Sequence, residues 1–284
     1  MSAIVVCGGS VIGLASAMIL ARDGYNVTVL ERDAGAVPGS ADEAWELWER
    51  RGVPQFRQPH NLLPRYRTIL QDELPEVLDG LLAAGGTWVN FLEMLPPFLT
   101  DRDPRPDDDK FRFVTRRRPM VEYVHARAAQ NEPRVTVRRG TKVEGLKTEA
   151  GTKGVPHVTG VRTSDGDLRA DLVVDAMGRR SPSVDWLVSA GARPPTMHSQ
   201  ECAFTYYTRH FTGPQAASGA RASRGPHRDV HDPDVARRQL NVVRDAVGTG
   251  ERPATQGVSS PAEVLEGRAG VPLARALARR RADH

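Results

Sequence analysis

The strongest constraint on the fold is a strand–turn–helix–strand pattern in the first 31 residues. An apolar run, Ala3 to Cys7, leads directly into the glycine-rich stretch GGSVIG. Small and apolar side chains then recur at helical spacing over residues 11–22, and Gly24 is a typical helix stop. A second valine-rich run spans Asn26 to Glu31. Because such units are right-handed, the pattern predicts two parallel neighbouring strands in an α/β fold.

The glycine-rich stretch has the features of a dinucleotide-binding turn. Gly8 permits a tight turn after the first strand, and Gly13 lets the helix pack closely on the sheet. Ser10 replaces the usual middle glycine, yet it is small enough for a pyrophosphate to approach the helix N-terminus. Glu31, at the end of the second strand, is placed to accept from ribose hydroxyls, which disfavours NADP. A turn that merely joins strand to helix is the alternative.

Downstream patterning predicts mixed secondary structure and then a change of composition. We expect broken helix over residues 40–85, helix over 119–129, and strands within 134–146, 157–163, 167–175 and 203–211. The 73 residues after Phe211 contain no Phe, Trp, Tyr, Ile, Met, Cys or Lys. Such a segment has little large apolar surface to offset its ordering entropy, so we expect a tail of low order.

Composition excludes several classes of protein. The net charge of +4 lies in the segment from Thr212 onward, which has 12 Arg and 8 acidic residues, and the preceding part is neutral. Nucleic-acid binding is therefore not expected. No apolar stretch is long enough to span a membrane, and we expect no membrane partner. Two cysteines, Cys7 and Cys202, and no visible signal peptide favour the cytoplasm. The scattered histidines predict no metal site.

A second motif, LRADLVVDAMGRRS at residues 168–181, separates FAD from NAD as the ligand. With VVCGGSVIGLASAMILARDGYNVTVLER and TRRRPMVEYVHARA, it resembles the FAD-dependent monooxygenases of the aromatic hydroxylase type. These have a glutathione-reductase-like FAD domain and include halogenase and reductase relatives. The resemblance runs from residue 3 to about residue 211. It implies a Rossmann-like FAD-binding domain with a parallel sheet, an incomplete antiparallel substrate sheet and a disordered C-terminal tail.

The resemblance also implies roles for individual residues. In the family, the first motif contacts the pyrophosphate and the ribose of FAD. The arginine that opens RPMVE contacts the flavin side of the cofactor. The second motif returns to the same pyrophosphate. These cofactor-binding residues are Gly8, Ser10, Val11, Ile12, Gly13, Glu31, Arg32, Arg118, Asp175, Gly178 and Ser181. A solvated basic run is the alternative for Arg118, and a capped strand end is the alternative for Asp175. Met177 stands where many hydroxylases have an aspartate implicated in nicotinamide contacts.

The implied function is that of an FAD-dependent oxidoreductase of the monooxygenase or hydroxylase type. Its substrate is expected to be a small apolar or aromatic molecule, with NAD(P)H as electron donor. Because the oxygen chemistry of this family belongs to the flavin, no catalytic residue is assigned, and His60 is a candidate for contact with flavin or substrate. The alternative is a non-catalytic nucleotide-binding remnant.

The expected domains are discontinuous. Residues 1–86 and 115–195 form the FAD-binding domain, residues 87–114 and 196–213 a partial substrate domain, and residues 214–284 the tail. A third family motif, Gly-Asp followed by small residues, has no match in the tail. We therefore hypothesise a frameshift near Gly213, after which the chain is truncated relative to the family and out of frame. A natural low-order tail is the alternative.

Overall fold

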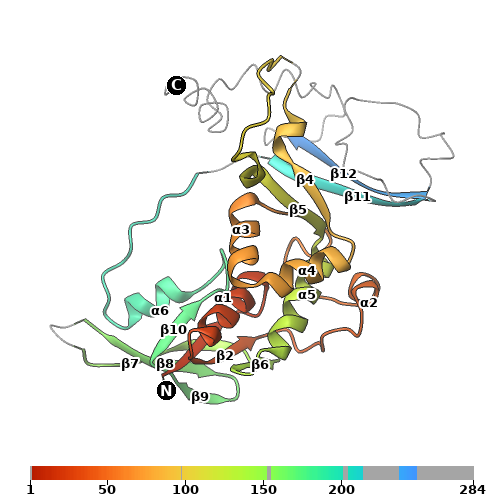
Figure 1. Cartoon of the computed structure of the whole chain (residues 1–284). Helices are drawn as coiled ribbons and strands as arrows, with labels where there is room; N and C mark the ends of the chain where they lie inside the picture. Colours follow the sequence, from red (N-terminus) through yellow and green to blue (C-terminus); the bar gives the residue numbers. More distant parts are fainter. Residues whose placement is uncertain (1, 97, 152–154, 201–203, 214–236, 248–284) are drawn as a thin grey trace. The chain divides into compact units, whose positions relative to one another are not determined.

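The computed structural model describes residues 2–96, 98–151, 155–200, 204–213 and 237–247, with side chains described up to residue 200. The chain divides into two compact units, residues 1–199 and 200–284, which are described separately (Figure 1).

A four-stranded parallel sheet forms the centre of the first unit, with the order β10-β1-β2-β6. Its strands are β1 (Ala3–Cys7), β2 (Asn26–Glu31), β6 (Val135–Arg139) and β10 (Leu172–Asp175). β1 pairs with β2 and with β10 in parallel, and β2 pairs with β6 in parallel. The first strand–helix–strand unit has the predicted bounds, since α1 spans Val11–Arg22. The prediction of a parallel α/β sheet is confirmed.

Six α-helices and two short 3₁₀ helices complete the described part of the first unit. They are α1 (Val11–Arg22), α2 (Ala41–Glu46), α3 (Pro64–Glu73), α4 (Pro75–Ala83), η1 (Phe91–Met94), η2 (Asp108–Phe111), α5 (Arg118–Asn131) and α6 (Ser183–Ser189). α1 packs against α5, and α5 packs against α2 and α4 (Figure 1). The apolar face of α1 is buried through Leu14, Ala17, Met18 and Ala21. This packing fixes α5 beside the glycine-rich turn.

Two three-stranded antiparallel sheets flank the parallel one. The first has the order β3-β5-β4, built from β3 (Pro59–Leu62), β4 (Thr87–Asn90) and β5 (Arg112–Arg117). The second has the order β7-β8-β9, built from β7 (Val143–Glu149), β8 (His157–Thr163) and β9 (Gly166–Arg169).

Some strands of these sheets differ from those that the sequence patterns predict. Residues 40–85, expected as broken helix, also contain β3, a four-residue strand that exists through its pairing with β5. The single strand expected over 167–175 is two strands in different sheets, β9 and β10. The expected domain boundary between residues 114 and 115 lies inside β5, and the domain division itself stays a prediction.

The described part of the second unit is one antiparallel pair. β11 (Phe204–Gly213) pairs with β12 (Arg237–Val247), with a register shift between Phe211 and Gly213. Within the segment expected to be of low order, the structure describes one strand, β12, over residues 237–247. Their sequence, RRQLNVVRDAV, has three valines and a leucine, and β pairing supplies the backbone hydrogen bonds that composition alone does not predict. Residues 214–236 and 248–284 lie outside the described residues, and the frameshift hypothesis stays a prediction.

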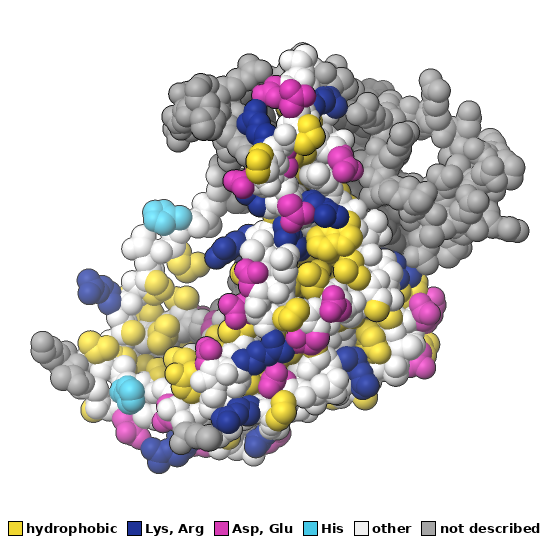
Figure 2. Space-filling model, viewed as in Figure 1, with side chains coloured by type: hydrophobic (Ala, Val, Ile, Leu, Met, Phe, Trp, Pro, Cys, Tyr) yellow, Lys and Arg dark blue, Asp and Glu magenta, His cyan; other side chains and the backbone are white. Residues whose placement is uncertain are grey.

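The surface of the first unit carries charges of both signs. Figure 2 shows Lys and Arg side chains interspersed with Asp and Glu on the visible face, without a continuous basic area. Among the described residues, no helix has the length and apolar content needed to cross a membrane.

Candidate functional site

The glycine-rich turn lies at the carboxyl ends of β1 and β2, where ligands of open parallel sheets bind. Gly8 has φ of +111°, which favours glycine. A Cβ at Gly8 would lie 2.6 Å from the carbonyl oxygen of Ala176, and one at Gly13 would overlap the carbonyl oxygen of Gly8. A Cβ at Gly9 would lie 2.8 Å from the Cβ atom of Glu31. The backbone of the glycine-rich turn is thus in close contact with its neighbours at all three glycines.

The second motif returns to the same turn. Cys7 of β1 pairs with Asp175 of β10, and the Ala176 amide donates to the Cys7 carbonyl at 2.8 Å. The Asp175 carboxylate accepts from the Met177 amide at 2.9 Å and from the Ser181 hydroxyl at 2.6 Å. Gly178 has φ of +78°. The structure therefore brings both motifs together, with Asp175 closing the turn after its strand, as the capped-strand alternative describes.

Cys7 lies in the core beside this turn. Burial, and after it the charge of Asp175, raises the pKa of the Cys7 thiol to about 12. The thiol is thus protonated at neutral pH and is unsuited to nucleophilic chemistry.

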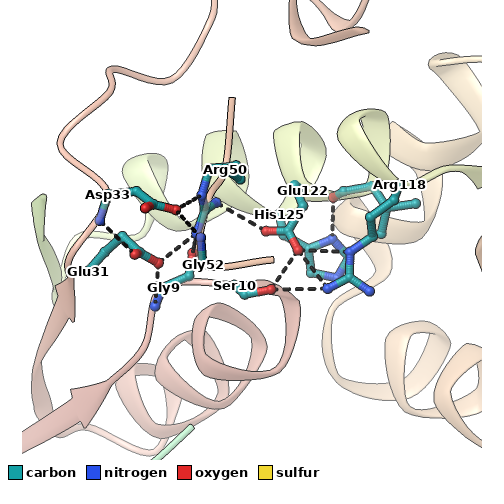
Figure 3. A network of polar contacts seen from close by, with 10 residues as sticks. Gly9, Ser10, Glu31, Asp33, Arg50, Gly52, Arg118, Glu122 and His125 are labelled. Atoms are coloured by element: carbon teal, nitrogen blue, oxygen red, sulfur yellow. Dashed lines mark hydrogen bonds and ion pairs between the residues drawn. The ribbon is translucent and has the colours of Figure 1, made fainter. Parts of the chain in front are cut away.

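A buried network of charged side chains lies over the glycine-rich turn (Figure 3). Its central carboxylate is Glu122 of α5, which has no exposed surface. Glu122 Oε1 accepts from Arg118 Nη2 at 2.6 Å and Nε at 2.8 Å, and from the Ser10 hydroxyl at 2.5 Å. Glu122 Oε2 accepts from Arg50 Nη1 at 3.2 Å. One carboxylate thus connects the turn to two arginines.

Arg50 connects this carboxylate to the end of β2. It donates to Glu31 Oε2 at 2.6 Å, to Asp33 Oδ2 at 3.1 Å and to the Gly9 carbonyl at 3.1 Å. Glu31 also accepts from the amides of Gly9 and Asp33, at 3.0 and 2.9 Å. The candidate ribose acceptor is therefore held in place beside the turn by three donors.

A cavity of about 290 Å³ opens beside Gly9 and the inner face of α1. Its polar lining includes Arg139 at the end of β6 and Gln130 of α5. Nε and Nη1 of Arg139 are buried without a hydrogen-bond partner, and burial, followed by the charge of Arg50, lowers the pKa of Arg139. The guanidinium lies 5.4 Å from the centroid of the Trp48 ring, whose buried Nε1 also has no partner. Buried donors without acceptors beside a cavity suit an acceptor-rich ligand.

His60 of β3 lies next to Arg118. Its Nε2 accepts from Arg118 Nη1 at 2.8 Å. Burial, and after it the charge of Arg118, lowers the pKa of His60 to about 4. The imidazole is thus neutral at physiological pH and orients Arg118.

A second buried histidine, His125, belongs to α5 and makes hydrogen bonds through both of its ring nitrogens. His125 Nδ1 donates to the Val121 carbonyl at 2.8 Å, and His125 Nε2 accepts from the Tyr66 hydroxyl at 2.8 Å. Burial is the main cause that lowers the pKa of His125 to about 4 and raises that of Tyr66. Both groups are neutral at physiological pH.

Stability should fall as pH falls from about 6.5 to about 4, because the unfolded chain then protonates His125 and the folded chain does not. The shift corresponds to about 3 kcal/mol at the acid end of this window. We expect His125→Gln to be less stable than wild type at pH 7 and to lose less stability on acidification. Urea unfolding at pH 7, 5.5 and 4 measures both. The matched control, His157→Gln on the exposed surface of β8, should keep the wild-type pH dependence; an H125Q curve parallel to wild type would contradict the assignment.

The remaining predicted residues occupy different environments. Val11 is buried in the core, whereas Ile12 is 60% exposed at the start of α1. Arg32 is exposed and lies near Gly52, and Arg118 is buried. The sequence did not single out Arg50, Glu122, His125 or Arg139. A glutamate four residues after Arg118 was the available signal for Glu122.

No group of three or more potential metal ligands is present in the part of the chain that the structure describes.

Comparison with protein-family models gives no match. Protein Rv3254 of Mycobacterium tuberculosis (strain ATCC 25618 / H37Rv) is 27% identical in an alignment 231 residues long that covers 74% of this chain and 45% of that protein. The chain thus spans about half the length of the curated relative it matches.

Two solved structures are similar to part of this chain. PqsL, a probable FAD-dependent monooxygenase from Pseudomonas aeruginosa, matches with a TM-score of 0.50 at 17% identity, over 74% of this chain and half of that one. The p-nitrophenol 4-monooxygenase PnpA from Pseudomonas putida DLL-E4 matches with a TM-score of 0.41 at 17% identity, over 75% of this chain and 47% of that one. The chain therefore has the FAD-dependent monooxygenase-like fold that its motifs predicted.

Proposed function

We propose that this chain binds FAD and is an oxidoreductase of the monooxygenase type, acting on a small apolar or aromatic molecule with NAD(P)H as electron donor. The observation that carries the proposal is the set of donors at the cavity. Nε and Nη1 of Arg139 are buried without partners beside Gly9, and the N-terminus of α1 begins at the same turn. An ADP group offers the acceptors and the negative charge that such donors need.

The residues present fit the ADP half of FAD. The three glycines of the turn let its backbone pack against the end of β10, against Glu31 and against the start of α1, and Glu31 is the acceptor for ribose hydroxyls. Gly178 and Ser181 close the turn after β10 on the side opposite β2. Arg118, oriented by Glu122 and His60, is proposed to contact the flavin side. When bound, the flavin would supply the redox chemistry and the activation of oxygen.

Arg139→Met tests the proposal because it separates binding from folding. We expect the variant to bind FAD at least about tenfold more weakly, since a charged hydrogen bond contributes about 1.5–3 kcal/mol. The free energy of unfolding should change by less than about 1 kcal/mol, because the guanidinium loses little beyond its contact with the Trp48 ring. Quenching of flavin fluorescence measures the affinity. Arg138→Met, on the exposed side of β6, is the matched control and should bind as wild type does.

Equal FAD affinity in wild type and the Arg139→Met variant would contradict the assignment of the ADP group to this cavity. The non-catalytic alternative makes the same binding prediction. Substrate-stimulated NAD(P)H oxidation distinguishes the two, because only an enzyme shows it.

A further inference from the structure

Two helices of the described part of the chain have a serine at the N-cap, and these two serines use their hydroxyls differently. Ser40 is the N-cap of α2, and its hydroxyl accepts from the Glu43 amide at 3.1 Å, as N-cap serines usually do. Ser10 is the N-cap of α1 and has the extended backbone of a cap, with φ of −99° and ψ of −176°. Its side chain nevertheless makes no capping hydrogen bond to the first turn of α1.

Glu122 accounts for the difference. The Ser10 hydroxyl has one proton, and it donates that proton to Glu122 Oε1 at 2.5 Å. The Ser10 hydroxyl oxygen in turn accepts from Arg118 Nη2 at 3.0 Å. Glu122 is fully buried, so water does not compete for its oxygens. A hydrogen bond to a charged acceptor is stronger than the neutral bond in which the hydroxyl oxygen would accept from a backbone amide, so the side chain of Ser10 is directed to Glu122 rather than to the first turn of α1.

We propose that Glu122 is a positioning residue that draws the Ser10 hydroxyl away from the first turn of α1. The amides of Val11, Ile12 and Gly13 are then left for an anionic ligand rather than for the cap. This inference rests on the proposed function, because the anion in question is the pyrophosphate of FAD. It also explains how a serine is accommodated where the motif usually has glycine: Glu122 occupies its hydroxyl.

Amide hydrogen exchange tests the coupling without any ligand. In wild type, the amides of residues 11–13 should exchange rapidly. In Glu122→Gln the side-chain oxygen is neutral and a weaker acceptor, so the Ser10 hydroxyl should turn to cap the helix and slow the exchange of at least one of them about tenfold. The double variant Ser10→Ala/Glu122→Gln has no hydroxyl and should exchange rapidly again. Glu122→Asp keeps the charge for the arginines and shortens the reach to Ser10, so it should show the same slowing.

FAD affinity of the same proteins gives the second readout. Glu122→Gln should weaken binding about tenfold or more when Ser10 is present, and by no more than about threefold in the Ser10→Ala background. Ser10→Ala alone gives the reference affinity against which the Ser10→Ala/Glu122→Gln double variant is compared. Glu132→Gln, beyond the far end of α5, is the control and should leave both readouts unchanged.

The outcomes separate the inference from the proposed function. If wild type binds FAD but Glu122→Gln weakens binding equally in both backgrounds, or leaves the exchange of residues 11–13 unchanged, the role of Glu122 is overturned and FAD binding stands. If the exchange pattern follows the prediction but wild type binds no FAD, the Ser10–Glu122 coupling stands and the proposed function fails.

Discussion

Replacing Gly13 by alanine should abolish tight FAD binding and destabilise the fold. The added Cβ would overlap the carbonyl oxygen of Gly8, which is fixed in the turn by the hydrogen bond from the Gly8 amide to the Leu30 carbonyl at 2.8 Å. α1 must then move away from the turn. Alanine gains about 1 kcal/mol of helix propensity over glycine, but overpacking of this kind costs about 3 kcal/mol and wins. We expect the FAD affinity to fall on the order of 100-fold.

Urea unfolding and flavin fluorescence measure the two effects of Gly13→Ala. Gly35→Ala is the matched control, because its Cβ would meet only Trp48 Nε1, at an ordinary 3.9 Å. The control should keep the wild-type affinity and stability within about 1 kcal/mol. Wild-type FAD affinity in a folded Gly13→Ala protein would show that the turn does not approach the cofactor.

Replacing Arg50 by methionine should be the most destabilising change in the charged network. The Arg50 side chain is 1% exposed and lies within 3.2 Å of carboxylate oxygens of Glu31, Asp33 and Glu122. Its removal leaves three acidic groups, for which Arg118 is the one remaining cation in hydrogen-bond contact among the described side chains. Breaking a buried ion pair from one side costs about 3–5 kcal/mol, because the remaining charge stays buried without its partner.

A second substitution shows whether the loss comes from uncompensated charge. Arg50→Met/Glu31→Gln removes one of the three carboxylates and should recover at least about 1 kcal/mol of the unfolding free energy that Arg50→Met loses. Lys142→Met removes an exposed cation that lies 3.5 Å from Glu144, and it should cost less than about 1 kcal/mol. A double variant as unstable as the sum of its single variants would contradict the account of a coupled network.

The sequence predicts the nucleotide turn well because its pattern is local. The bounds of β1, α1 and β2 follow from hydrophobic periodicity and glycine positions alone, and the return of β10 to β1 follows from the second motif. β3 and β12 were not predicted, because each is defined by pairing with a distant strand rather than by its own pattern.

The charged network could not be predicted from local sequence. Arg50 lies in WERRG, which is typical of a solvated helix end, and Glu122 has the spacing of an ordinary surface ion pair with Arg118. Their burial arises when α5 packs against α1 and α2 and closes over the turn. Sequence separations of 112 residues between Ser10 and Glu122, and of 72 between Arg50 and Glu122, leave no periodic signal.

The stoichiometry of bound flavin is the most direct test of the central claim that both motifs form one FAD site. The purified full chain is incubated with excess FAD and passed through a desalting column, and the flavin and protein absorbance of the eluate are compared. One FAD per chain, displaced by excess ADP, is the predicted result. A chain that unfolds cooperatively but elutes free of flavin would contradict the claim.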